Sequence, residues 1–199
     1  MPDNGARSRS ALVVEAMATG AWLGLAQVGL GFALLAGSGA SALLFFALTG
    51  AWLGGGALGV LGLGSRGGAL RSSGGITAPR LTSGSDSFSR ASTGSWLLGL
   101  SLVALGLARA VLAQPRFSDI FTAVGLGAGA LVGAYAGHFL RERAPAWGDV
   151  RALLLHENNG FVAGYAAAGA LLFVSARALD AAAGVLGAVL LGRSLLRLR

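Results

Sequence analysis

The 199-residue chain is 54% hydrophobic and only 12% charged, with a mean hydropathy of +0.70, which excludes an ordinary soluble domain. Its net charge of +7 comes from fifteen arginines and no lysine. These arginines lie between apolar runs and do not gather on one face, so they indicate membrane topology and not nucleic-acid binding. The absence of cysteine excludes disulfides and thiolate metal sites.

Two apolar runs near the N-terminus predict two membrane helices. Residues 1–10 form a short polar tail, and residues 11–36 are apolar apart from Glu15 and Gln27. The apolar part of a signal peptide has about 7–15 residues, so this longer run is predicted to be a retained helix. A second helix is expected over residues 41–63, after a turn without charge.

The rest of the chain alternates polar and apolar stretches. Residues 64–95 are rich in Gly, Ser and Arg and predict a mobile loop. Four more helices are predicted at residues 96–113, 120–140, 152–175 and 180–196. The predicted fold is therefore an all-α integral membrane protein, a single bundle of six transmembrane helices in the lipid bilayer. Five crossings are the main alternative, if the last two helices do not both cross.

Arginine placement predicts the orientation of the six helices. Six crossings put both termini on one side, and twelve of the fifteen arginines fall on that side. The other side receives Arg109, Arg116 and Arg177. Because arginine in short loops favours the cytoplasm, both termini are predicted to be cytoplasmic, with the protein in the plasma membrane.

Glycines recur at a spacing of four, which places them on one helix face. The longest ladder is Gly125, Gly129, Gly133 and Gly137. The same spacing occurs in four other pairs, at positions 20 and 24, 50 and 54, 55 and 59, and 160 and 164. Such faces let two helix backbones approach closely in a membrane. They predict either packing inside the bundle or the seam of a homodimer.

A few ionisable residues lie at the ends of the predicted helices. Glu15 begins the first helix and is expected to be solvated at the membrane interface. Arg109 can extend its charged group to the membrane surface. His138, near Arg141, is expected at the interface and not as a ligand. Asp180 is expected to cap the N-terminus of the last helix.

The polar cluster of residues 156–159, His-Glu-Asn-Asn, interrupts the apolar run of residues 153–179. An imidazole and a carboxylate suit zinc or manganese, and a carboxylate in a membrane suits proton exchange. His156 and Glu157 are therefore the candidate metal ligands. The alternative is that the cluster only meets water at the end of its helix.

The sequence contains no pattern typical of catalysis. Hydrolase triads, phosphate loops, HExxH and CxxC patterns are missing, and the glycine-rich string GLGAGA at residues 125–130 follows no predicted strand. We therefore expect no enzyme activity and no bound cofactor.

Five segments resemble the transmembrane domain of the cation diffusion facilitator (cation efflux) family. They are AGSGASALL (36–44), LGVLGLGSR (58–66), LAQPRFSD (112–119), LLLHENNGFVAGY (153–165) and ALDAAAGVLGAVLLG (178–192). The resemblance covers residues 26–196 and implies a six-helix fold, a dimer and export of a divalent cation.

The resemblance also implies where an ion would bind. The family's ligand pairs correspond to Thr49 and Leu53 and to Leu153 and Glu157, so the sequence is degenerate there and keeps only Glu157, with His156 beside it. Two functions follow from this pattern. One is divalent cation transport, and the other is a structural or interaction role for a relative that no longer transports.

Reporter fusions test the predicted orientation. Fusions after Arg90, Arg143 and Arg199 should give cytoplasmic signals, whereas fusions after Gly37 and Arg116 should give signals from the other side. An external signal at Arg199 would contradict the six-crossing topology.

Overall fold

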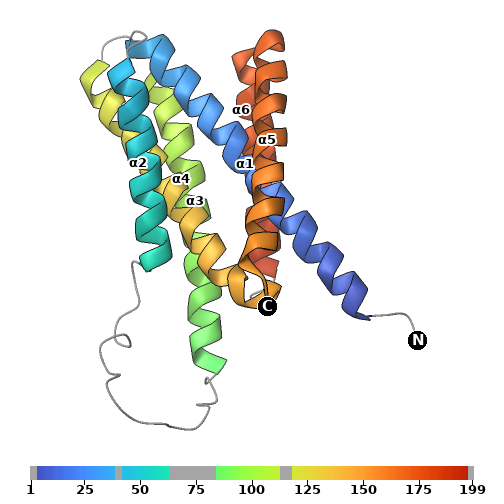
Figure 1. The fold of residues 1–199 in the computed structure, drawn as a ribbon. Helices are drawn as coiled ribbons and strands as arrows, with labels where there is room; N and C mark the ends of the chain where they lie inside the picture. The colour runs from blue at the N-terminus through green and yellow to red at the C-terminus, as the bar shows by residue number, and fades with distance from the viewer. Residues whose placement is uncertain (1–3, 39–41, 63–83, 113–117, 197–199) are drawn as a thin grey trace.

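A computed structural model describes residues 4–38, 42–62, 84–112 and 118–196, and these residues form six α-helices without a strand (Figure 1). The helices are α1 (Asn4–Ser38), α2 (Ala42–Leu61), α3 (Gly84–Leu112), α4 (Ser118–Trp147), α5 (Val150–Val174) and α6 (Ala176–Leu196). The predicted all-α class is confirmed.

Length and composition suit five of the described helices to a membrane. These are α1, α2, α3, α4 and α6. Backbone groups in hydrocarbon must be satisfied within the segment, which a helix does. Helix α5 is long enough at 25 residues, but the polar residues 156–159 lower its apolar content. The chain is thus an all-helical bundle of the multi-pass membrane type.

Successive helices run in opposite directions (Figure 1). Helix α1 begins and α6 ends at the lower end of this view, which we call the terminal end. The short connection between α5 and α6 lies at the other end, the opposite end. Both ends of the chain are thus carried to the same end of the bundle, as the alternation of apolar runs predicts.

Two short turns join the last three helices. Between α4 and α5, Gly148 has φ +67°, which glycine adopts without strain, and the Asp149 carboxylate accepts a hydrogen bond from the Arg151 N–H at 2.9 Å. Between α5 and α6, the Ser175 hydroxyl accepts from the Ala178 N–H at 3.0 Å. Ser175 therefore caps α6, and the predicted capping role of Asp180 is wrong.

Several helices extend beyond their predicted bounds. Helix α1 begins at Asn4, within the predicted tail, and α3 begins at Gly84, within the predicted loop of residues 64–95. Helix α4 continues to Trp147, past its predicted end at residue 140, and α6 begins at Ala176, before its predicted start at residue 180. Apolar composition locates the part of a helix that suits a membrane, whereas polar residues can continue the helix into water. Residues 64–83 of the predicted loop lie outside the described residues.

Glycines form a seam between α2 and α4. A Cβ added at Gly59 would overlap the carbonyl of Ala134, and one added at Gly137 would overlap the carbonyl of Gly56. The two backbones thus touch where a side chain would stand, which is the close approach that small residues permit in membranes.

Helices α1 and α5 form a second seam of the same kind. A Cβ at Gly20 would overlap the Glu157 carbonyl, and one at Gly164 would overlap the Ala21 carbonyl. The glycines of both seams are therefore covered within one chain, and packing inside the bundle explains them. Gly50 and Gly54 have no atom within 4 Å of an added Cβ, so this pair belongs to neither seam.

The α2–α4 seam predicts a position-dependent effect of alanine. Gly133→Ala would push its methyl group into the Trp52 carbonyl, so we expect a loss of about 1–3 kcal/mol in stability. Gly127→Ala on the same helix meets open space and should be neutral or slightly stabilising. Thermal unfolding in detergent measures both, and equal midpoints would contradict the seam.

Candidate functional site

Four helices, α1, α3, α4 and α6, turn faces toward a common line through the bundle. On α1 this face carries Glu15, Thr19, Trp22, Ala26 and Gly29, at the alternating spacing of four and three that keeps residues on one side of a helix. The matching residues of α6 are Asp180, Ala183, Gly187, Leu190 and Ser194. Those of α3 are Ser95, Leu98, Leu102, Leu105 and Arg109. Those of α4 are Val132, Tyr135, Phe139 and Glu142. We call this line the four-helix axis.

Charged and hydroxyl groups surround a small pocket at the terminal end of the four-helix axis. The residues that line the pocket are Glu15, Thr19, Gly94, Tyr135, His138, Phe139, Glu142, Arg143, Leu190, Arg193 and Ser194. The pocket measures about 30 Å³. A buried water needs about 10–15 Å³ on the same measure, so the pocket has room for about two waters or one small ion.

An ion pair between α1 and α4 forms one wall of this pocket. The Arg143 guanidinium donates to Glu15 Oε1 at 2.8 Å, and the two side chains are 23% and 16% exposed. A carboxylate this shielded is stabilised by its cationic partner. Glu15 was expected to be solvated at the interface, but it lies in a protein-lined pocket instead.

Two further contacts complete the polar wall. His138 Nε2 lies 3.6 Å from Glu142 Oε2, one turn further along α4. The hydroxyls of Ser95 and Ser194 lie 2.7 Å apart and join α3 to α6. His138 thus faces an acidic neighbour on its own helix, one turn closer to the terminal end.

The opposite end of the four-helix axis carries a second ion pair. Arg109 of α3 pairs with Asp180 of α6, and their side chains are 23% and 39% exposed. Gly29 of α1 lies beside the Arg109 guanidinium and leaves space for it. Arg109 was expected to extend its charge to the membrane surface, but its charge meets a carboxylate within the bundle.

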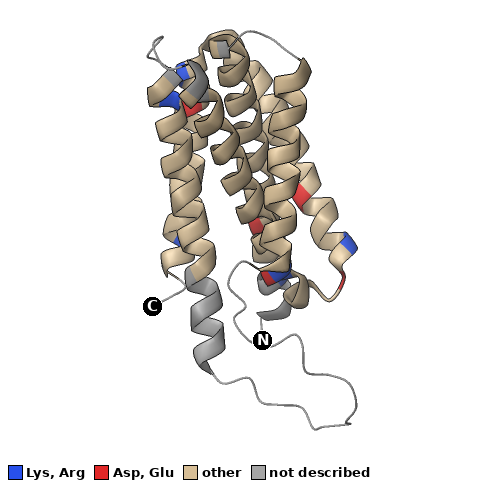
Figure 2. Cartoon of the chain, turned by 90° about the vertical axis from the view of Figure 1, so that its left-hand side faces the viewer, with Lys and Arg blue, Asp and Glu red and all other residues tan. Residues whose placement is uncertain are grey.

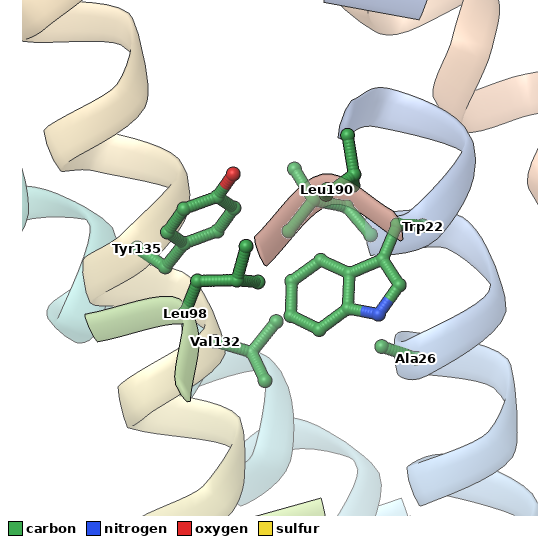
Figure 3. Packing of buried hydrophobic residues seen from close by; sticks show 7 residues of the cluster. Trp22, Ala26, Leu98, Val132, Tyr135 and Leu190 are labelled. Carbon is green, nitrogen blue, oxygen red and sulfur yellow. The ribbon is translucent and has the colours of Figure 1, made fainter. Parts of the chain in front are cut away.

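Apolar side chains separate the two polar ends. Trp22 of α1 is fully buried and packs edge-on against Tyr135 of α4, with ring centroids 5.5 Å apart at 87°. Leu98 and Leu190 close the same layer from α3 and α6 (Figure 3). Most charged residues lie towards the two ends of the described helices, and a few acidic residues lie part-way along the helices (Figure 2).

The predicted ligands His156 and Glu157 lie outside this arrangement, on α5. The centroids of the His156 ring and of the Trp147 ring, at the end of α4, lie 5.4 Å apart, and the rings are tilted by 41°. Both His156 and Glu157 are half-buried. The Glu157 backbone belongs to the α1–α5 seam. Among the described residues, no group of three or more His, Asp or Glu side chains is arranged to hold a metal ion.

The other positions implied by the family resemblance do not converge with Glu157. Thr49 donates to the Phe45 carbonyl of its own helix at 2.9 Å. Leu53 is 66% exposed, whereas Leu153 is fully buried. The sequence did contain a signal for the four-helix axis, namely the spacing of Glu15, Thr19 and Trp22, but not the identity of the partners.

Neither a protein-family model, nor a curated protein, nor a solved structure matches this chain. Its class therefore rests on the fold itself, which is an apolar helical bundle with ionisable groups at both ends of one interior line.

The Glu15–Arg143 pair predicts a coupled loss of stability. Arg143→Gln leaves the Glu15 carboxylate without its cation, so we expect a loss of about 1.5–3 kcal/mol, whereas Arg151→Gln at an exposed position should have little effect. The double variant Glu15→Gln/Arg143→Gln should lose less than the sum of the two single changes, measured by thermal unfolding in detergent. Additive losses would mean that the two groups do not interact.

Proposed function

We propose that the chain crosses the plasma membrane six times, with both termini in the cytoplasm. The arginine bias supports this orientation, and the alternating direction of six helices supports the number of crossings. Helix α5 has 25 residues and packs against α1 along the glycine seam, so it would cross the membrane beside α1.

Within that topology, the proposed function is transport of a small cation along the four-helix axis. The observation that carries this proposal is the arrangement of polar groups at both ends of one interior line, closed in the middle by Trp22 and its neighbours. Ionisable residues inside a membrane bundle typically mark ion or proton pathways. The small size of the pocket favours an ion over an organic solute.

A cation is favoured over an anion by the carboxylates of the pocket. Glu15, Glu142 and His138 line the pocket together with Arg143 and Arg193, and in this arrangement they do not form a metal site. Carboxylate and imidazole groups are the ligands that a divalent cation would take there if Arg143 moved away from Glu15. The family resemblance points to the same cargo, although it implies Glu157 and His156 as ligands. The two sets of residues are alternative sites for one function.

The second candidate function is a structural or interaction role without transport. It is favoured by the α1–α5 seam, where the backbone of Glu157 contacts α1. It is also favoured by the other implied ligand positions, because none of them carries a carboxylate or an imidazole. Such a protein would act through partner proteins in the membrane or as a homodimer. Neither candidate function involves an enzyme activity or a resident cofactor.

Flux measurements in reconstituted vesicles separate these proposals. Wild-type protein should carry zinc or manganese, and Glu15→Gln/Arg143→Gln should reduce the flux by about tenfold or more, because it removes the carboxylate whose charge-assisted contact with the cation contributes about 1.5–3 kcal/mol. Asp149→Asn is the matched control, since it removes a carboxylate at an exposed cap outside the pocket and should leave the flux unchanged.

The variant Glu157→Gln distinguishes the two candidate sites. Under the four-helix axis it should leave most of the flux intact. Loss of flux in Glu157→Gln alone would move the ion site to α5, and a wild type that carries neither cation would favour the non-transporting role.

A further inference from the structure

Trp22 lies at the centre of the closed layer, and its position is unusual for tryptophan. Tryptophan in membrane proteins prefers the interface with water. Trp96 fits this preference, because it lies near the start of the apolar part of α3 and is 73% exposed. Trp22 is fully buried, midway between the polar pocket and the Arg109–Asp180 pair. Thr19 and Ala26, one turn away on either side, have much smaller side chains.

The indole of Trp22 also makes a polar contact with another helix. Its Nε1–H donates to the backbone carbonyl of Ala183 on α6, at 3.1 Å. A buried indole N–H needs a partner, and this partner belongs to a different helix. The hydrogen bond therefore ties α1 to α6 at the level of the apolar layer.

Gly187 makes the seat for this indole. A Cβ added at Gly187 would lie 2.6 Å from Trp22 Nε1 and would also overlap the Leu102 side chain. Unlike the glycines of the two seams, Gly187 faces side chains and not a neighbouring backbone. Its missing side chain thus admits the ring into the space between α3 and α6.

We propose that Trp22 is the gate of the four-helix axis, held closed by its hydrogen bond to the Ala183 carbonyl and seated on Gly187. This inference rests on the proposed transport function. Opening requires the interhelical hydrogen bond of Trp22 to break and its ring to leave the layer. The layer around it, formed by Leu98, Val132 and Leu190, excludes water in the closed state.

The absence of cysteine in the chain allows a direct test. Ala26→Cys places a single thiol just beyond the gate, at a position that is 2% exposed. In vesicles, a small membrane-impermeant thiol reagent added at the terminal end should label this thiol slowly. Adding Trp22→Phe removes the hydrogen bond and part of the ring volume, and should raise the labelling rate about fivefold. Adding Trp22→Ala opens the layer and should raise it by at least about tenfold.

Two further variants test whether the change in labelling is specific to Trp22 and its seat. Trp96→Phe changes an exposed tryptophan at the same end and should leave the labelling rate unchanged. Gly187→Ala disturbs the seat without replacing Trp22 and should raise labelling as Trp22→Phe does. Circular dichroism and a single gel-filtration peak confirm that each variant is folded.

The outcomes separate the gate from the transport function. Unchanged labelling in folded Trp22→Phe and Gly187→Ala, or fast labelling in the Ala26→Cys parent, would overturn the gate even if cations are carried. Faster labelling in these variants together with no cation flux in the wild type would uphold the closure at Trp22 and overturn the cargo proposed above.

Discussion

Direct contact between helix backbones at glycines is the constraint on which the rest of the bundle depends. Helices in lipid gain little from hiding apolar side chains, so close packing has to hold them together. The α1–α5 and α2–α4 seams achieve this because carbonyl groups occupy the space that a Cβ would need at Gly20 and Gly137. At these glycines the two helices of each seam leave no space for a side chain between their backbones.

The seams determine where ionisable groups can gather. A backbone-to-backbone contact leaves no space for a charged side chain, so the inward-facing charges fall where α1, α3, α4 and α6 pack through side chains. There Glu15 meets Arg143 and Arg109 meets Asp180. Such pairs are needed in a medium of low dielectric constant, because a lone charge would be costly. The four-helix axis follows from this division between the seams and the side-chain contacts.

The same division bears on the family resemblance. Its implied ligand positions lie on α2 and α5, the two helices that the glycines bind most closely to neighbours, and Thr49, Leu53 and Leu153 carry no carboxylate or imidazole. The ionisable groups that do meet lie on α1, α3, α4 and α6. A transport function of this chain would therefore rely on a different set of helices from the one the resemblance implies, with Trp22 at its centre.

The sequence by itself determined the helical class, the order of apolar segments and the glycine spacing, because hydropathy and periodicity are local properties. It did not determine helix ends, since polar residues extend α1 and α3 beyond their apolar parts. It also did not determine partners. Glu15 and Arg143 stand 128 positions apart, and Asp180 looked like a helix cap until Arg109 was placed beside it. Only tertiary packing decides which helices become neighbours, because many arrangements bury the same apolar faces while only one brings these charges together.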